Sequence, residues 1–202
     1  MFNTDPRTHS VASESAGATS VGPLVNGIDT TAFMAAGAAM VSDPSLAPVH
    51  FSAKSTWQGG LRSQTEIESY QLGERTIARR HVIRSDEPNE ILGSNTAPNP
   101  QDLLLAALNA CMLVGFVAAA TKRGIEVQHL CIQSSLGFDL RGAFGLDASL
   151  KPGAELIRYR LEVKAKASPE QLAEVHEEMK MTSPNRWHLS QPMRFDAEFV
   201  VR

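Results

Sequence analysis

The sequence has only two cysteines, Cys111 and Cys131, in 202 residues. A small secreted scaffold held together by disulfides is therefore excluded, because such scaffolds need several cysteine pairs. The N-terminus also lacks a basic segment followed by an apolar run, which is the pattern of a secretory signal peptide. We therefore expect a cytoplasmic protein in a reducing compartment.

An excess of positive charge and the common cofactor motifs are missing as well. The formal net charge is -3, which argues against a nucleic-acid partner. No group of His, Cys and acidic residues has the spacing of metal ligands, and neither a glycine-rich phosphate loop nor a Gly-x-Ser-x-Gly turn occurs. We therefore expect neither a metal nor another cofactor.

One apolar run is nearly long enough to span a membrane. Residues 103–120 are apolar except for Asn109 and Gly115, and a bilayer span needs about 20 residues. The run is rich in alanine, contains a polar asparagine and lies between amphipathic strands. A helix that is apolar on all sides also suits the centre of a soluble core, so we predict a core helix and no membrane partner.

The remaining pattern predicts an α+β domain over residues 51–202, preceded by an N-terminal arm over residues 1–50. The arm begins with the Ser-, Ala- and Thr-rich segment 1–21, which is typical of a flexible chain, and a short helix is expected from Asp29 to Met40. Strands are predicted where apolar and polar residues alternate, in the segments 51–57, 62–72, 75–84, 126–140, 159–166 and 193–201.

Two longer helices have clear start and stop signals. The first follows Asn99, a favourable N-cap, with Pro100 at the first helical position. It ends at Gly124, a natural helix terminator. The second starts at the capping box 168–171 and stops before Pro184.

Cys111 lies well inside the first of these helices, among apolar or small neighbours. Such surroundings disfavour a thiolate, and the helix dipole acts only within the first turn. Two interpretations therefore stay open from the local sequence: a packed small hydrophobic residue, or a reactive thiol whose activating cation comes from elsewhere in the fold. Cys131 lies on the polar side of its strand, and we expect it to be an ordinary strand residue.

Residues 99–111, Asn-Pro-Gln-Asp-Leu-Leu-Leu-Ala-Ala-Leu-Asn-Ala-Cys, resemble the helix of the OsmC/Ohr family of thiol-dependent hydroperoxide reductases. The resemblance runs from about residue 50 to the end and fits the branch with a single motif cysteine. It implies an OsmC-like fold, in which antiparallel sheets wrap around long central helices in an intertwined homodimer. Further matching pieces are Trp57-Gln58-Gly59-Gly60, Leu92-Gly93, Asp139-Leu140-Arg141-Gly142 with Gly145-Leu146, and Ser183-Pro184.

The resemblance also implies an activity and a set of site residues. Cys111 would be the peroxidatic cysteine that reduces an organic hydroperoxide, and Arg62, with Arg80 as the runner-up, would supply the activating cation. Gln101 stands where the family has a glutamate that pairs with this arginine, and an amide can hydrogen-bond an arginine without neutralising it. Substrate contacts would come from Ser183, His188 and Leu108.

Ser183 marks a departure from the family pattern, because other members have a second, resolving cysteine there. A hydroxyl cannot form a disulfide, so we expect an external thiol to resolve oxidised Cys111. His188 follows in the loop that approaches the thiol in the family, where it is either a surface residue or a base that makes a Cys–His pair. The alternative function is a non-catalytic OsmC-fold protein that binds a small apolar ligand at the dimer interface.

Overall fold

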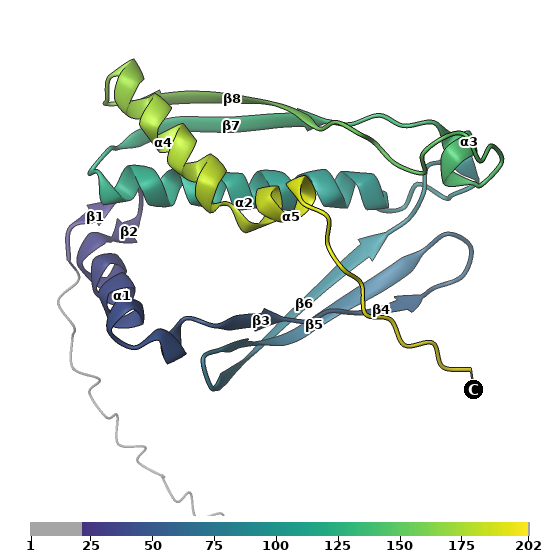
Figure 1. The fold of residues 1–202 in the computed structure, drawn as a ribbon, viewed down its shortest axis with the longest axis horizontal. Helices are drawn as coiled ribbons and strands as arrows, with labels where there is room; N and C mark the ends of the chain where they lie inside the picture. The colour runs from purple at the N-terminus through teal and green to yellow at the C-terminus, as the bar shows by residue number, and fades with distance from the viewer. Residues whose placement is uncertain (1–21, 202) are drawn as a thin grey trace, which may run out of the picture.

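The computed structural model describes residues 22–201, and Figure 1 shows how their helices and strands are arranged. The segment 1–21, predicted to be a flexible arm, lies outside the described residues. In chain order the elements are β1 (Leu24–Val25), β2 (Ile28–Asp29), α1 (Thr30–Ser42), η1 (Pro44–Leu46), β3 (Val49–Phe51), β4 (Lys54–Trp57), β5 (Ser63–Leu72), β6 (Arg75–Ser85), η2 (Asn89–Ile91), α2 (Pro100–Lys122), β7 (Val127–Ser135), α3 (Leu140–Ala143), β8 (Arg158–Ala165), α4 (Pro169–Thr182) and α5 (Pro184–Ser190).

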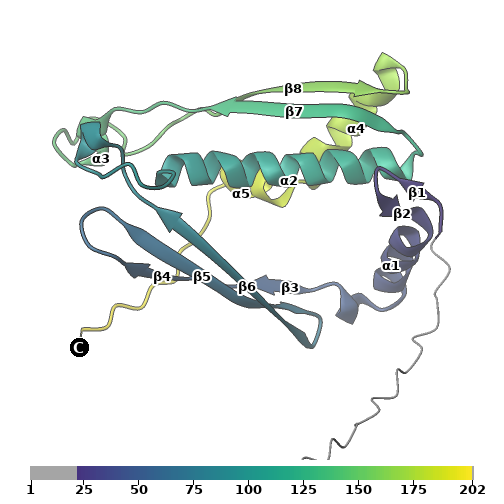
Figure 2. The same cartoon turned by 180° about the vertical axis from the view of Figure 1, so that it is seen from behind.

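These elements form a mixed α and β structure with antiparallel sheets, as the alternation in the sequence predicts. The β7–β8 hairpin, together with α4 and α5, packs on α2 in one part of the molecule. A second sheet has β5 at its centre, with β3 and β4 along one edge and β6 along the other. Figures 1 and 2 show this second sheet as a separate layer on the other side of α2.

The helix α2 forms where its capping signals predict. The Asn99 side chain accepts a hydrogen bond from the backbone of Asp102, whose carboxylate in turn accepts one from the backbone of Asn99, so two orphan donors are satisfied. The chain leaves the helix at Gly124, where φ is +66° and glycine is favoured. The capping box at the start and the glycine after the end thus set the bounds of this 23-residue helix.

One face of α2 carries the core of the molecule. Met112 and Phe116 are fully buried there, against Val175 and Met179 of α4. Fully burying side chains of this size stabilises the fold by about 1.5–3 kcal/mol each. The same face also contacts the β7–β8 hairpin, so α2 packs against both this hairpin and α4.

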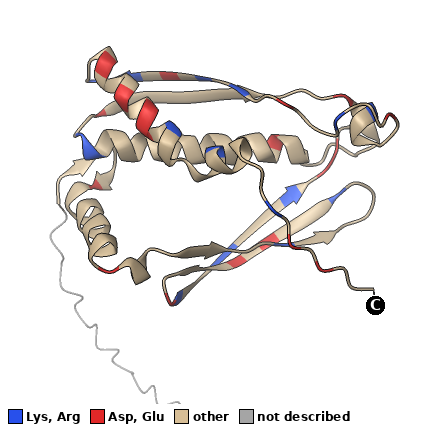
Figure 3. Cartoon of the chain, viewed as in Figure 1, with Lys and Arg blue, Asp and Glu red and all other residues tan. Residues whose placement is uncertain are grey.

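The opposite face of α2 is exposed in the single chain. It consists of Ala106, Ala107, Ala110 and Val114, and Val114 is 70% exposed. Figure 3 shows that the charged residues of α2 lie near its ends, while α4 carries several acidic residues. By length and composition alone α2 could cross a membrane, although a core helix has the same character. Within one chain α2 is therefore a core helix on one face only.

The N-terminal part of the described chain is tied to the end of α2. The helix expected after Asp29 is present as α1, and the Asp29 carboxylate caps it. Just before it, the Asn26 side chain donates to Thr121 Oγ1 at 3.1 Å and to the Ile125 carbonyl at 2.9 Å. It also accepts from the backbone of Val127 at 2.8 Å. These bonds join β1–β2 to the turn between α2 and β7.

Three predicted strands differ from the structure. The segment 51–57 is split into β3, which ends at Phe51, and β4, which begins at Lys54, and the two strands pair with different parts of β5. The strand predicted over 126–140 ends at Ser135, which faces the first residue of β8. Leu140 instead begins the short helix α3, with Asp139 as its cap.

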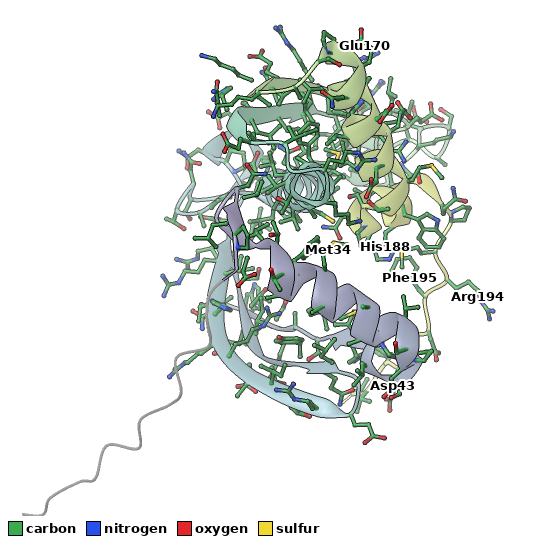
Figure 4. All side chains as sticks on the ribbon, turned by 90° about the vertical axis from the view of Figure 1, so that its left-hand side faces the viewer. Met34, Asp43, Glu170, His188, Arg194 and Phe195 are labelled. Atoms are coloured by element: carbon green, nitrogen blue, oxygen red, sulfur yellow. The ribbon has the colours of Figure 1, made fainter. Side chains whose placement is uncertain are left out.

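The strand predicted over 193–201 is the clearest difference. The segment forms no regular secondary structure, and it has no strand partner among the described residues. Its apolar side chains remain exposed, with Phe195 at 94% and Phe199 at 92%. Figure 4 labels Phe195 on the chain that continues from α5. An alternating pattern forms a strand only where a sheet edge is available, and this single chain does not place one beside it.

Candidate functional site

The candidate site is the contact between Cys111 on α2 and the start of α5. Cys111 is half-buried, whereas Cys131 on β7 is exposed. The Ser183 hydroxyl donates a hydrogen bond to Cys111 Sγ at 3.3 Å, and the backbone N–H of Asn185 donates to the same sulfur at 3.5 Å. Two neutral donors from one turn of the chain therefore converge on the thiol.

Ser183 is held in place by the junction of two helices. It ends α4, where its backbone N–H donates to the Met179 carbonyl at 3.0 Å. It also precedes α5, where its carbonyl accepts from the Trp187 backbone at 3.0 Å. The side chain is 1% exposed, so its hydroxyl is withdrawn from solvent and directed at Cys111.

Asn185 is a site residue that the sequence interpretation missed. Its side-chain amide donates to the Ala107 carbonyl at 2.9 Å and so fastens α5 to α2 one turn before Cys111. Its backbone N–H lies in the first turn of α5, where a helix has no internal acceptor for it. The signal available in the sequence was Ser183-Pro184, a helix start whose next N–H groups need a partner.

Three other predicted site residues, Arg62, Arg80 and His188, make no hydrogen bond to Cys111 within residues 22–201. Arg62 lies in the turn between β4 and β5, where its Nε donates to the Gly59 carbonyl at 3.3 Å. Arg80 lies on the exposed surface of β6. His188 is exposed on α5 and packs edge-on against Trp187, with ring centres 5.7 Å apart. Their proposed roles at the thiol stay predictions.

Gln101 and Leu108 line a cavity of about 430 Å³ beside the thiol site. The cavity lies between α2, α5 and the chain that leads into β8, and its walls are mostly apolar. Arg186, one residue after Asn185, also lines the cavity, and its guanidinium donates to the Lys180 carbonyl at 2.8 Å. Cys111 itself is not among the lining residues, which are Gln101, Leu104, Leu108, Met112, Leu136, Gly153, Ala154, Glu155, Leu156, Ile157, Tyr159, Arg186, Leu189 and Ser190.

A histidine of α4, His176, lies next to a residue of the cavity wall. The hydroxyl of Tyr159, a lining residue, lies 3.0 Å from Nε2 of His176 on α4. Burial lowers the pKa of His176, and the positive charges of Lys180 and Arg186 lower it further, against the opposing charge of Glu177. The neutral form of His176 is therefore favoured.

Within residues 22–201, no three His, Cys, Asp or Glu side chains come close enough together to hold a metal ion. The chemistry that the described site offers is therefore that of a half-buried thiol with two hydrogen-bond donors and an apolar cavity nearby.

Comparison with known proteins gives a consistent result. A family model described as OsmC-like protein matches residues 93–197. The solved structure of an OsmC-like protein from Mycoplasma pneumoniae is 15% identical, with a TM-score of 0.53 over 69% of this chain and 86% of that one. No curated protein sequence matches.

Two further solved structures are similar. An osmotic stress induced and detoxification response protein from Psychrobacter arcticus is 17% identical, with a TM-score of 0.51 over 67% of this chain and 85% of that one. An organic hydroperoxide resistance protein from Legionella pneumophila is 16% identical over 69% of this chain and 88% of that one, with a TM-score of 0.46. At such identities the two structures with TM-scores above 0.5 establish a shared fold and nothing finer.

Proposed function

We propose that this chain, which belongs to the family of OsmC-like proteins, reduces organic hydroperoxides with Cys111 as the peroxidatic thiol. The observation that carries the proposal is the pair of donors directed at Cys111 Sγ, from the Ser183 hydroxyl and the Asn185 backbone. Hydrogen bonds donated to the charged form of a group favour that form. The thiolate is the nucleophilic form of cysteine, and these two donors are placed to hydrogen-bond it.

In the proposed reaction the thiolate attacks one oxygen of the peroxide O–O bond. The S–O bond forms as the O–O bond breaks, which leaves a sulfenic acid on Cys111 and releases an alcohol after protonation. The sulfur is oxidised by two electrons and the peroxide is reduced by two. The apolar cavity beside the site, with Leu108 in its wall, suits a hydroperoxide with an apolar body.

We assign the activating cation to Arg62 of a second copy of the chain. Arg62 lies between β4 and β5, in the layer on the other side of α2 (Figure 1). The exposed apolar face of α2 supports an intertwined homodimer, because such a face needs cover that one chain does not supply. Gln101 would hold this arginine by hydrogen bonding and leave its charge uncompensated. Arg80 is the second choice for the cation.

An external thiol would return Cys111 to its reduced form, and we place the protein in the cytoplasm, where such thiols are abundant. Ser183 occupies the position of the resolving cysteine in other members, which supports placement in the branch with one motif cysteine. Cys131 is exposed on β7 opposite Glu162 and makes no contact with this site. His188 would contact the substrate from α5.

The cavity also favours a second candidate function, which is non-catalytic binding of a small apolar ligand. Its walls are largely apolar, and Cys111 is not among its lining residues. In that case Cys111 is a packed residue that oxidises no faster than a free thiol. A bound ligand would then contact Leu108 and Met112 rather than the sulfur.

The test is the reaction of one equivalent of an alkyl hydroperoxide with the reduced protein. The proposal expects the Cys131→Ser protein to consume the peroxide rapidly and the Cys111→Ser protein to leave it unconsumed. Equal loss in both variants would indicate that the two cysteines act together, and unchanged peroxide in both would favour the ligand-binding alternative.

A further inference from the structure

We propose that the backbone nitrogen of Asn185 is the internal resolving group of this site, and that it captures oxidised Cys111 as a cyclic sulfenyl amide. The inference rests on the proposed function, since it begins from the sulfenic acid that the peroxide reaction leaves on Cys111. It assigns to a main-chain amide the task that a second cysteine performs in other thiol peroxidases.

The geometry of α5 brings this nitrogen to the sulfur. The Asn185 nitrogen lies 3.5 Å from Cys111 Sγ, and its N–H is directed at the sulfur. Because the N–H bond lies in the peptide plane and points at Sγ, the electron pair left by its deprotonation would point at Sγ too. This N–H belongs to the first turn of α5 and has no helical acceptor to lose.

The surroundings keep the two atoms together. The Asn185 side chain is hydrogen-bonded to the Ala107 carbonyl at 2.9 Å, one turn from Cys111 on the same helix. On the other side the Ser183 hydroxyl lies 3.3 Å from the sulfur. A sulfenic acid formed here would therefore have both a nucleophile and a hydroxyl that can hydrogen-bond its departing oxygen.

No second thiol of the same chain competes for the sulfenic acid. The chain has one other cysteine, Cys131, which is exposed on β7, whereas Ser183 beside Cys111 is 1% exposed. A sulfenic acid that finds no thiol condenses with a nearby backbone nitrogen where one is in reach. Within this chain Asn185 supplies that nitrogen.

The proposed step is balanced. The sulfenic acid Cys111–S–OH and the Asn185 N–H lose one water: the S–O and N–H bonds break, and the S–N bond forms. No electrons are exchanged in this step, because the organic hydroperoxide has already oxidised the sulfur. A small thiol then attacks the sulfur and releases the N–H, which leaves a mixed disulfide, and a second thiol frees Cys111.

The consequence for the protein is protection of its single site thiol. A sulfenic acid that meets more peroxide proceeds to the sulfinic acid, which ordinary thiols cannot reduce. The sulfenyl amide has no S–O⁻ nucleophile to oxidise, so it holds the site at a reversible stage until a thiol arrives.

Mass spectrometry of the full-length Cys131→Ser protein tests the inference. After one equivalent of tert-butyl hydroperoxide, we expect the intact mass to fall by two hydrogen atoms relative to the reduced protein. Digestion should yield the Cys111 and Asn185 peptides joined by a bond that dithiothreitol cleaves. A persistent sulfenic acid that dimedone labels in full, with no joined peptides, would overturn the inference and leave the proposed function standing.

Two variants at one position supply the matched control. Asn185→Ala keeps the backbone N–H but loses the side-chain hydrogen bond to Ala107, so it should still form the joined peptides, in lower yield. Asn185→Pro lacks the N–H and should give only the dimedone adduct. Circular dichroism establishes whether each variant is folded. If the proline variant is not folded, the mass spectrometry of the Cys131→Ser protein with Asn185 intact is the deciding test. Joined peptides in a folded Asn185→Pro protein would contradict the inference, and no oxidation of Cys111 in any protein would overturn the proposed function with it.

Discussion

Cys111 has its polar surroundings because α4 ends and α5 begins beside it, and not because of its own helix. Its neighbours along α2 are small or apolar, and the helix end lies too far away for the dipole to act. Both donors come from a junction some seventy residues later in the chain, at Ser183 and Asn185. The local sequence around a thiol therefore says little about its reactivity.

Removal of the Ser183 hydroxyl should slow the reactions of Cys111. A hydrogen bond to a charged group contributes about 1.5–3 kcal/mol, so we expect Ser183→Ala to lower the rate of alkylation by iodoacetamide about tenfold at neutral pH. Thr182→Ala is the matched control, because that neighbouring hydroxyl donates to the Glu178 carbonyl and not to the sulfur. Identical rates for the two variants would remove Ser183 from the proposed site.

The same rate measurement examines the proposed cation. If Arg62 reaches Cys111 from a second copy, Arg62→Ala should slow the alkylation while Arg80→Ala leaves it unchanged. The reverse order would move the assignment to Arg80. An unchanged rate in both variants would mean that the two neutral donors act without a cation.

Asp86 fixes the loop that leads into α2, and it should make the stability of the protein depend on pH. The residue is 1% exposed, and its carboxylate accepts from the backbones of Glu87, Ser94 and Thr96 and from the Thr96 hydroxyl at 2.7 Å. The backbone hydrogen bond from Thr96 contributes most to lowering the pKa of Asp86, against the opposing effect of burial.

A lowered carboxylate pKa stabilises the folded protein above the unfolded pKa, about 3.9 for Asp. That contribution is lost as the pH falls through the lower folded value. We therefore expect Asp86→Asn to be less stable than the parent protein in urea unfolding at neutral pH, with a smaller difference at about pH 3. A difference that stays the same at both pH values would show that the charge of Asp86 is not involved.

At the scale of elements, helix and hairpin positions follow from short-range signals and were predictable. The capping of α2 by Asn99, the capping box of α4 at Ser168 and the hairpin turn at Gly73 all lie where the sequence places them. Each of these signals acts between residues that are close in the chain. By contrast, α5 begins at Pro184 in a segment interpreted as a loop, and it brings Asn185 to the thiol.

The exposed face of α2 leads to a prediction about association. We expect the protein to sediment as a homodimer at micromolar concentration, with the small apolar residues of this face at the contact. Ala110→Lys should dissociate the dimer or weaken it strongly, because a buried unpaired ammonium is costly. Ala173→Lys is the matched control, since that alanine is exposed on α4.

A folded monomer in the parent protein would contradict this prediction. Equal dissociation by both lysine variants would show that the effect comes from added charge and not from the α2 face. Thermal unfolding of each variant separates loss of the dimer from loss of the fold.

At the scale of the whole molecule, the long-range arrangement was only partly predictable. The alternation over 193–201 predicts a half-buried strand that the single chain does not form, because periodicity does not specify the sheet edge that such a strand joins. Met193 is 52% exposed and Val201 is 79% exposed in the single chain. The phenylalanines between them, Phe195 and Phe199, are exposed as well. Together with the exposed face of α2, this exposed segment motivates the homodimer that we propose.

The site shares this limit. Cys111 and Ser183 were found from the order of motifs along the chain, and the fold brings them into contact. Arg62 lies in the turn between β4 and β5, and in the proposed dimer its position relative to Cys111 would depend on how the two copies assemble. A residue supplied by another chain leaves no trace in local patterns, so its role is open to experiment alone.

The account depends most on whether Cys111 is a fast, specific thiol for organic hydroperoxides. The direct measurement is stopped-flow oxidation of the reduced Cys131→Ser protein by tert-butyl hydroperoxide, followed by loss of free thiol. The account predicts one thiol lost per peroxide consumed, at a rate well above that of free cysteine at the same pH, and no reaction in the Cys111→Ser protein. Oxidation of Cys111 no faster than that of free cysteine would contradict it and would assign the apolar cavity to ligand binding.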